Sequence, residues 1–268
     1  IMKQGQSLSD ITTRVLKGLE EVIKEVKPDI ILVHGDTTTT FAGALAAFYQ
    51  QVAIGHVEAG LRTYNKYSPF PEEMNRQFVG VMADMNFAPT EQSKQNLIRE
   101  GKNPDSIYVT GNTAIDALKL TVNQEYNDEI TEWVGDDRLI VLTAHRRENL
   151  GEPMLRMFRA IRRIIDKYDD VKMVYPVHLN PLVVDAANKV FGDCDKIKLI
   201  KPLEVVEFHN LLSRSYLILT DSGGIQEEAP SLGKPVIVLR DTTERPEGIT
   251  AGTLKLAGTE EETIFRLV

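Results

Sequence analysis

The chain has 268 residues, with 31 Lys or Arg against 39 Asp or Glu, and its formal net charge is −8. This length allows a sizeable core in one or two domains, and the charge argues against a general binder of nucleic acid or membrane surfaces. A single cysteine, Cys194, excludes an internal disulfide and fits a reducing compartment. The sequence shows no apolar run of membrane-span length and no signal peptide, so we expect a cytoplasmic protein.

Apolar periodicity predicts that helices and strands alternate from the start of the chain. An amphipathic helix over 7–26, capped by Ser7 or Ser9, precedes a strand over 29–33. The next predicted elements are, in order, helix 38–49, strand 52–60, helix 72–82, strand 85–88, helix 90–99, strand 107–110 and helix 113–120. Segment 121–137 is polar and acidic, and it reads as a linker or a joining helix.

A second set of alternating elements follows residue 137. It comprises strand 139–143, helix 153–167, strand 171–177, helix 181–191, strand 196–200, helix 204–213, strand 217–219, helix 225–231 and strand 235–239. Strands that are apolar on both faces and alternate with helices indicate parallel sheets covered by helices. We therefore predict an α/β protein with one domain over 1–120, a linker over 121–137 and a second domain over 138–268.

Polar residues follow the predicted strands, and ligands of parallel sheets bind beyond the carboxyl ends of strands. In the first set, the carboxylates at these ends are Asp36, Glu58, Glu72 and Glu73. Each has a structural alternative: Asp36 could cap a helix, Glu58 could pair with Arg62, and the last two could complement a helix start. The sequence equally favours acid–base chemistry at this edge. His34 and His56 suggest zinc, but their spacing is not that of a zinc site, so we expect no metal.

The second set places basic groups at its strand ends. His145 and Arg146 follow one strand and His178 follows the next. A later strand runs into Ser222-Gly223-Gly224 and a helix, where free backbone N–H groups and the positive helix end suit a phosphate. Four further residues belong to this stretch, two acceptors for sugar hydroxyls and two forked donors for phosphate: Glu227, Glu228, Arg240 and Arg245. A bare βα turn is the alternative, and the surrounding charges favour a nucleotide-diphosphate site between the two domains.

Eight motifs, in order, carry a resemblance to a known family. They are HGDTTTT, HVEAGLRT, PFPEEMNRQ, TGNTAIDAL, LTAHRREN, PVHLNP, TDSGGIQEEAP and LRDTTERPE. Together they resemble the bacterial non-hydrolysing UDP-N-acetylglucosamine 2-epimerases. The resemblance implies two Rossmann-like domains facing across a cleft (the GT-B architecture). It also implies interconversion of UDP-N-acetylglucosamine and UDP-N-acetylmannosamine without a cofactor, through anti elimination of UDP to 2-acetamidoglucal and its re-addition.

The same resemblance implies roles for individual residues. Acid–base catalysis falls to Asp36, Glu58 and Glu72, and stabilisation of the departing diphosphate to His145. Four residues would hold the phosphates, namely Ser222, Gly223, Gly224 and Arg245, while Glu228 would hold the ribose and Phe208 would lie near the uracil. A core position is the alternative for Phe208. A second, activating UDP-N-acetylglucosamine would contact Gln6, Glu72, Arg146 and His178, and a homodimer is implied.

The family's amino-terminal strands and its final helix are not recognisable in this sequence. Members of the family begin with a strand and a Gly-Thr-Arg-Pro-Glu-type loop, and end with a helix that crosses back to the first domain. We therefore expect both segments to be missing from the chain as given. Three rival functions remain open on the same architecture: a UDP-sugar glycosyltransferase, a hydrolysing 2-epimerase and a non-catalytic UDP-sugar sensor.

Overall fold

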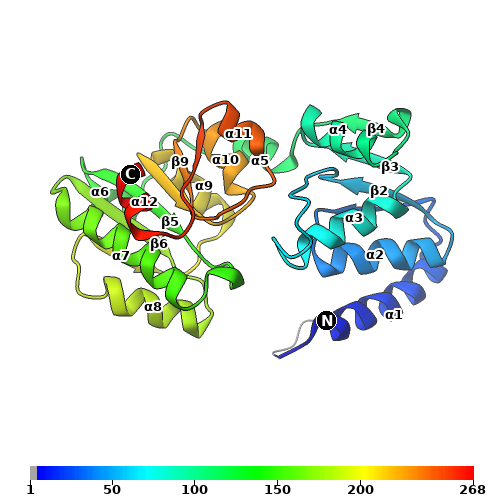
Figure 1. The fold of residues 1–268 in the computed structure, drawn as a ribbon, viewed down its shortest axis with the longest axis horizontal. Coiled ribbons are helices and arrows are strands. Elements are labelled where there is room, and N and C mark those ends of the chain that lie inside the picture. The colour runs from blue at the N-terminus through cyan, green and yellow to red at the C-terminus, as the bar shows by residue number, and fades with distance from the viewer. Residues whose placement is uncertain (1–4) are drawn as a thin grey trace. The chain divides into compact units, whose positions relative to one another are not determined.

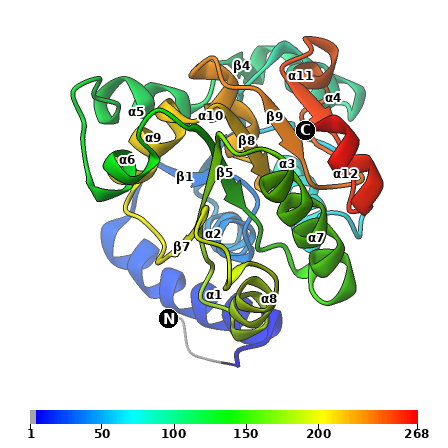
Figure 2. The same cartoon turned by 90° about the vertical axis from the view of Figure 1, so that its left-hand side faces the viewer.

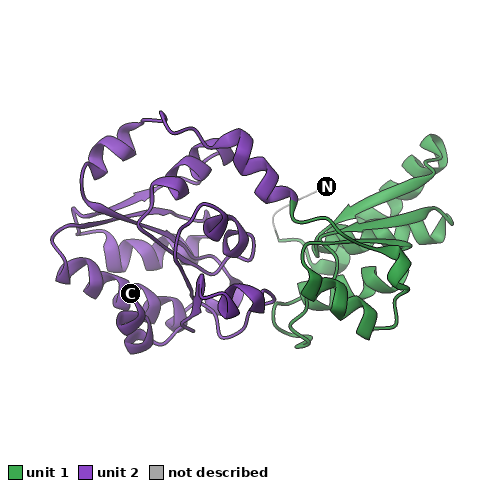
Figure 3. Ribbon diagram, turned by 90° about the horizontal axis from the view of Figure 1, so that it is seen from above, with its two compact units in different colours: residues 1–112 green, residues 113–268 purple. Residues whose placement is uncertain are grey.

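The computed structural model describes residues 5–268, and the chain divides into two compact units, 1–112 and 113–268 (Figure 3). Each unit contains one parallel β-sheet whose successive strands are joined mainly through helices (Figure 1). Parallel neighbours require crossover connections of this kind, because the chain must return to the same end of the sheet. The predicted α/β class with two parallel, helix-flanked sheets is confirmed.

In the first unit, neighbouring strands in the sequence are also neighbours in the sheet, in the order β1–β2–β3–β4. They are β1 (Ile30–His34), β2 (Ala53–Val57), β3 (Met85–Ala88) and β4 (Ile107–Val109). The helices are α1 (Leu8–Val26), α2 (Thr38–Tyr49), α3 (Glu72–Met82) and α4 (Glu91–Arg99), with a 3-10 turn η1 at Pro104–Ser106. Because all four strands run in one direction, the loops that follow them begin at the same edge of the sheet.

Local sequence explains how the first two helices form and pack. The Ser7 hydroxyl accepts a hydrogen bond from the Asp10 backbone N–H at 3.1 Å, and the Asp10 carboxylate accepts one from Ser7 N–H at 3.0 Å. This capping box starts α1 and confirms Ser7, one of the two predicted caps. In α2, the small side chains of Ala44 and Ala47 are buried against the sheet with Ile54, so the helix can lie close to the strands.

The sheet of the second unit has the strand order β10–β9–β8–β5–β6–β7. Its strands are β5 (Arg138–Thr143), β6 (Val171–Pro176), β7 (Ile197–Ile200), β8 (Leu217–Thr220), β9 (Val236–Val238) and β10 (Leu254–Leu256). Its helices are α5 (Thr113–Thr121), α6 (Glu129–Val134), α7 (Glu152–Lys167), α8 (Pro181–Phe191), α9 (Val205–Arg214), α10 (Ile225–Ser231), α11 (Pro246–Thr250) and α12 (Glu261–Leu267), with a 3-10 turn η2 at Arg147–Asn149.

The central strand β5 divides the core of the second unit into two layers, because successive side chains of a strand point to opposite faces. Ile140 and Leu142 pack with α7, α8 and α12 on one face. Leu139 and Val141 pack with α6, α9 and α10 on the other face. Figure 2 shows the sheet of this unit with helices on both sides. Both faces are apolar, which is why this strand reads as a continuous hydrophobic run in the sequence.

Several predicted bounds agree with the structure, and the last part of the chain does not. Helices α2, α3, α8 and α10 and strand β3 have the predicted limits. Beyond residue 245 the structure adds α11, β10 and α12, none of which was predicted. These elements are 5, 3 and 7 residues long, and our sequence reading of the second set ended with the strand over 235–239 and the polar turn after it.

Segment 121–137 contains the short helix α6 (Glu129–Val134). Asp128 begins it, because its side chain accepts hydrogen bonds from the backbone N–H groups of Ile130 and Thr131 at 3.1 and 2.8 Å. Near its end, the Trp133 ring lies 5.0 Å from the Lys172 ammonium and 4.8 Å from the Lys198 ammonium. These two cation–π contacts fix the helix to strands β6 and β7.

Candidate active site

The strand order of the second unit reverses between β5 and β8. From β5 the chain passes through β6 and β7 to one edge, and it then returns to β8, β9 and β10 on the other side. Such a switch point leaves a crevice beyond the carboxyl ends of the two central strands, where ligands bind. Thr143 and Thr220 are paired in register, and their hydroxyls lie 2.6 Å apart. The loops 144–149 and 221–224 therefore start side by side.

Asp221 organises both of these loops. Its carboxylate is fully buried and accepts hydrogen bonds from the backbone N–H groups of His145 and Arg146, both at 2.9 Å, and from the Asn149 side chain at 3.2 Å. The Arg146 Nε also donates to the Asp221 carbonyl at 3.1 Å. We assigned no role to Asp221 from sequence. The available signal was an acidic residue directly after a buried strand, where an unpaired carboxylate would be unfavourable.

The loop held by Asp221 presents His145 beside His178. The two imidazole rings stack, with centroids 5.6 Å apart and planes inclined by 14°. His145 Nδ1 lies 3.5 Å from the Asp221 carboxylate. Burial lowers the pKa of His145, the Asp221 carboxylate opposes this, and His178 lowers the pKa further. The lowered pKa favours the neutral ring near pH 7.

Ser222, Gly223 and Gly224 lie between β8 and α10, as predicted for a phosphate loop. Ser222 N–H donates to the Thr220 hydroxyl at 2.9 Å, which fixes the start of the turn. A Cβ on Gly223 would lie 2.8 Å from both Arg245 Nη1 and Glu244 Oε1, so these side chains occupy the space that only glycine leaves open. The loop that we predict to bind phosphate is thus in direct contact with Arg245.

The acidic and basic residues of the two following loops pair with one another. Arg245 Nε is bonded to Glu227, and Arg245 Nη1 donates to Glu244 at 2.7 Å. Arg240, which we considered as a phosphate donor, is buried with 2% of its surface exposed, and its Nη1 donates to Glu244 at 3.0 Å. Of the two acidic neighbours on α10, Glu227 thus belongs to the arginine network, which leaves Glu228 as the candidate ribose acceptor.

Glu228 lies on α10 next to α9. Burial raises the pKa of its carboxyl, Glu227 adds to the rise and Arg245 opposes it. His209 Nε2 lies 3.7 Å from Glu228, and His209 Nδ1 lies 2.7 Å from the Thr121 hydroxyl. Phe208 is partly buried against the core of this face, which is the packing position that we considered as its alternative. The same position leaves part of its ring exposed.

In the first unit, α3 holds the Asp36 carboxylate. Arg76 Nη2 donates to Asp36 at 2.6 Å, and the Asn75 side chain donates to the Asp36 carbonyl at 2.9 Å. The proposed capping role of Asp36 is wrong, because the N-cap of α2 is Thr37, whose hydroxyl accepts from Thr40 N–H at 3.2 Å. Because Asp36 does not cap the helix, its carboxylate needs another explanation at the carboxyl end of β1.

Glu58 follows β2 and adopts a left-handed backbone conformation with φ of 64°. This conformation is unusual for a residue with a side chain, and it aims the carboxylate toward the loop after β1. The Glu58 carboxylate accepts a hydrogen bond from Asn112 at 3.3 Å and lies 3.9 Å from His34 Nε2. A Cβ on Gly35 would lie 3.1 Å from it. The loops after β1, β2 and β4 therefore meet at Glu58.

The adjacent residues Glu72 and Glu73 have different surroundings. Glu73 is fully buried and accepts hydrogen bonds from the backbone N–H groups of Thr63 and Tyr64, both at 3.0 Å, and from Gln77 at 3.0 Å. Glu72 has a buried oxygen, Oε2, without a hydrogen-bond partner among residues 5–268. Glu73 therefore holds a loop, and Glu72 remains the candidate catalytic carboxylate of the two.

Two further residues of the predicted clusters have structural roles. Arg62 makes two hydrogen bonds to Glu100, both at 2.7 Å. His56 is fully buried, and its Nε2 lies 2.8 Å from the Gly35 carbonyl. Burial lowers the pKa of His56 from 6.5 to about 4, while the Gly35 carbonyl opposes the shift. A neutral His56 donates its Nε2 proton to that carbonyl and so supports the turn that carries Asp36.

The residues predicted for a second nucleotide site are divided between the two units. Gln6 precedes α1 and Glu72 begins α3 in the first unit. In the second unit, Arg146 is bonded to the Asp221 carbonyl and His178 stacks on His145. His178 Nδ1 also accepts a hydrogen bond from Asn180 N–H at 3.1 Å. In the second unit, the predicted second-site residues thus adjoin the predicted catalytic histidine.

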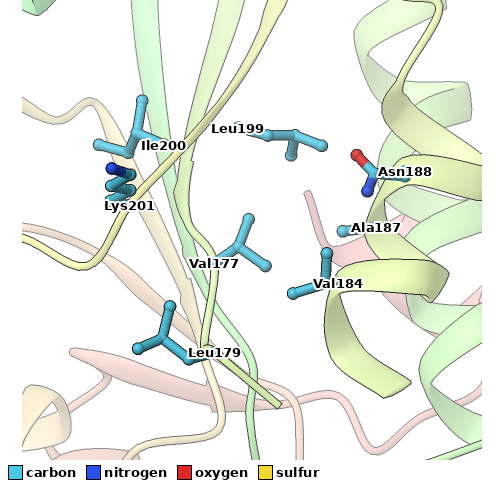
Figure 4. Close-up of a pocket in the computed structure, with 8 residues that line it drawn as sticks. All are labelled: Val177, Leu179, Val184, Ala187, Asn188, Leu199, Ile200 and Lys201. Atoms are coloured by element: carbon cyan, nitrogen blue, oxygen red, sulfur yellow. The ribbon is translucent and has the colours of Figure 1, made fainter. Parts of the chain in front are cut away.

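A separate pocket with a volume of about 240 Å³ lies between α8 and the end of β7 (Figure 4). Its lining is mostly aliphatic, from Val177, Leu179, Val184, Ala187, Leu199 and Ile200, with Asn188 and Lys201 as the polar members. The predicted site residues do not line it. Within residues 5–268, no helix is both long enough and apolar enough to span a membrane, and no three His, Cys, Asp or Glu side chains group as metal ligands do.

Two parallel sheets covered by helices, with polar side chains on the loops beyond their carboxyl ends, define a Rossmann-like α/β protein. A family profile for UDP-N-acetylglucosamine 2-epimerase matches residues 1–268. The chain belongs to this family, which confirms the resemblance seen in the eight motifs.

Individual relatives agree with this assignment. The UDP-N-acetylglucosamine 2-epimerase of Bacillus subtilis is 67% identical over 267 residues, which cover 100% of this chain and 70% of the relative. A structure of MnaA from S. aureus with UDP has a TM-score of 0.96 at 59% identity, covering 98% of this chain and 72% of that one. The Neisseria meningitidis UDP-GlcNAc 2-epimerase bound to UDP-GlcNAc has a TM-score of 0.94 at 49% identity, covering 100% and 74%.

Proposed function

We propose that this protein is a non-hydrolysing UDP-N-acetylglucosamine 2-epimerase, which interconverts UDP-N-acetylglucosamine and UDP-N-acetylmannosamine. Membership of the 2-epimerase family over residues 1–268 carries the proposal. Relatives that bear this name reach 67% identity. The three carboxylates and the histidine that the reaction calls for are all present, as Asp36, Glu58, Glu72 and His145.

The chemistry explains why two groups of residues are needed. The C2 proton of the sugar is weakly acidic, so its removal is coupled to departure of UDP from C1, which leaves the C1–C2 double bond of 2-acetamidoglucal. Return of a proton to C2 on the opposite face and re-addition of UDP to C1 complete the inversion. Acid and base groups are therefore required on two faces of the sugar, and a cation or donor set is required for the diphosphate.

We assign the acid–base steps to the first unit. Asp36 accepts a hydrogen bond from Arg76, and Glu58 accepts one from Asn112. One oxygen of Glu72 has no hydrogen-bond partner in the described part of the chain. The three carboxylates have different neighbours, and inversion at C2 needs one group to remove a proton and another to return one. This assignment requires that the polar loops of the first domain (1–120) and of the second domain (138–268) contact the same substrate.

We assign UDP binding to the second unit. The backbone of Ser222, Gly223 and Gly224 and the guanidinium of Arg245 would receive the diphosphate, and Glu228 would accept hydrogen bonds from the ribose. The exposed part of the Phe208 ring would lie along the uracil. His145, held on Asp221, would become an imidazolium beside the diphosphate and stabilise its departure.

The finer predictions are extensions of this proposal. A second UDP-N-acetylglucosamine would act as an activator through Gln6, Glu72, Arg146 and His178, and the protein would be a homodimer in the cytoplasm, where nucleotide sugars are made. The stacking of His178 on His145 supports the first of these, because a ligand on one ring would affect the other.

Incubation with UDP-N-acetylglucosamine in D₂O tests the proposed activity. We expect UDP-N-acetylmannosamine with one deuterium at C2, and no change in rate on addition of EDTA. Release of free N-acetylmannosamine and UDP would identify a hydrolase instead. Transfer of the sugar only when an acceptor is supplied, without deuterium in the donor, would identify a glycosyltransferase. Binding without turnover would identify a sensor.

A further inference from the structure

Arg240 lies directly after β9, and its charge is placed where charges are costly. Its side chain is 2% exposed, and two of its nitrogens, Nε and Nη2, have no hydrogen-bond partner among the described residues. Burial lowers the pKa of Arg240, and the Glu244 carboxylate opposes the shift. Replacing a buried charged pair by aliphatic side chains of similar volume often leaves the stability of a protein unchanged or raises it. A buried guanidinium with two unpartnered nitrogens among the described residues points to a role other than packing.

Arg240 shares one carboxylate with Arg245. Arg240 Nη1 donates to Glu244 Oε2 at 3.0 Å, and Arg245 Nη1 donates to the other oxygen, Glu244 Oε1, at 2.7 Å. On its other side, Arg245 is bonded through Nε to Glu227. The Arg245 guanidinium is thus bonded to both Glu227 and Glu244, and Arg240 is bonded to Glu244.

The same residue borders the loop that carries His145. Arg240 Nε lies 3.9 Å from Glu148 in η2, and the carbonyl of the preceding residue, Leu239, accepts a hydrogen bond from Asn149 at 3.3 Å. Asn149 also donates to Asp221, which holds the His145 backbone. Arg240 therefore stands between the loop with Arg245 and the loop with His145.

We propose that Arg240 is a positioning residue for the nucleotide diphosphate: it fixes Glu244, and Glu244 holds the Arg245 guanidinium against Gly223. The proposal rests on the proposed function, because it concerns the same UDP site. The 2.8 Å that separate a Cβ on Gly223 from both Arg245 and Glu244 indicate how little freedom this arrangement has. Without Arg240, Glu244 keeps one guanidinium partner but loses its fixed direction.

The test is the affinity for UDP, measured by calorimetry on the purified protein, which requires no turnover. We expect Arg240→Met to raise the dissociation constant at least tenfold, and Arg240→Lys to raise it less, because a lysine can still pair with Glu244. In Arg245→Met, the added change Arg240→Met should raise the dissociation constant less than twofold, because both act through one guanidinium.

A matched control separates positioning from loss of stability. Arg62 has an equally buried guanidinium, bonded twice to Glu100 in the first unit, and Arg62→Met should leave the UDP affinity of the folded protein unchanged. If Arg240→Met fails to fold, Arg240→Lys and Glu244→Gln provide the same comparison. Wild-type affinity in the folded Arg240 variants, or additive effects of the two arginine changes, would overturn the proposal. If Arg245→Met itself binds UDP normally, the assignment of the UDP site is what fails.

Discussion

The guanidinium of Arg76 lies 2.6 Å from the carboxylate of Asp36, although the two residues are 40 positions apart in the chain. Arg76 is 2% exposed, and its Nη1 donates to Glu73 at 3.3 Å. Asn75, one residue earlier, bonds the Asp36 backbone carbonyl. Helix α3 therefore fixes both the backbone and the side chain of the residue that we place at the reacting carbon.

Arg76→Met tests this relationship. We expect kcat for epimerisation to fall by about 10-fold to 100-fold, because an unheld catalytic carboxylate loses its alignment. The affinity for UDP, which depends on the second unit, should change less than about threefold. Arg76→Lys should recover part of kcat through its remaining charge. An unchanged kcat in folded Arg76→Met would show that Asp36 does not depend on this contact.

Substitution of the adjacent residues Glu72 and Glu73 should affect catalysis and stability separately. We expect Glu72→Gln to reduce the rate of C2 deuterium incorporation by about 100-fold or more, the usual range for a lost acid or base, with an unchanged melting temperature. Glu73→Gln should instead lower the free energy of unfolding by about 2 kcal/mol, because buried N–H donors lose a charged acceptor. Asp36→Asn and Glu58→Gln should reduce the rate of C2 deuterium incorporation in the same way as Glu72→Gln. A loss of stability in Glu72→Gln and a loss of rate in Glu73→Gln would show that we have assigned the two roles the wrong way round.

His56 should make folding depend on pH. Its pKa is about 4 in the folded chain and 6.5 as the ordinary value, so the unfolded chain binds the proton more readily. Its contribution is complete above pH 6.5 and is lost as the pH falls toward 4, with an upper limit of about 3 kcal/mol. Urea unfolding followed by circular dichroism at pH 7 and pH 5 should show a smaller loss in His56→Asn than in wild type. Equal losses would contradict the burial of a neutral ring.

Glu228 should make the affinity for UDP depend on pH. Burial raises the pKa of its carboxyl, so protonation removes the ribose acceptor at a higher pH than for an ordinary glutamate. Glu228→Gln should bind UDP weakly, and the ratio of wild-type affinity to the affinity of this variant should fall between pH 8 and pH 5. The ratio removes the opposite contribution of His145, whose protonation favours the diphosphate. Because the buried charge opposes folding above the raised pKa, Glu228→Gln should be at least as stable as wild type at pH 8. A ratio that stays constant between pH 8 and pH 5 would contradict the role of Glu228.

Gly223→Ala should weaken UDP binding without unfolding the protein. The added Cβ would lie 2.8 Å from the ends of two side chains, Arg245 and Glu244, which can move aside but then leave their positions. We expect about a tenfold loss of affinity, in line with one displaced charged donor. Gly18→Ala is the control, because a Cβ there meets nothing within 4 Å. It should leave UDP binding unchanged.

The sequence predicts those parts of the fold whose signal is local. The limits of α2, α3, α8 and α10 follow from apolar periods bounded by turn residues. Sequence reasoning missed the three short elements after residue 245, which follow a polar turn and have no motif that marks a strand end. The polar loops could be predicted for the same reason as the strands, because a parallel sheet gathers its carboxyl ends at one edge.

Residues that act through distant partners could not be predicted. Asp221 binds backbone groups 75 and 76 positions away, and Arg76 reaches Asp36 across 40 positions. No spacing rule connects such residues, because the sheet order rather than the sequence brings them together. Arg240 illustrates the same limit. Its charge suggested a phosphate ligand, but the side chain is buried and bonded to Glu244.

Trp133 is the only tryptophan of the chain, and it lies in α6 of the second unit between Lys172 and Lys198. When the indole is excited selectively, its emission reports on the surroundings of Trp133 in that unit. Denaturation recorded by indole fluorescence beside a whole-chain signal would separate the melting of the two halves without any label. Variants such as Arg76→Met and Arg240→Met could then be sorted by which half they loosen.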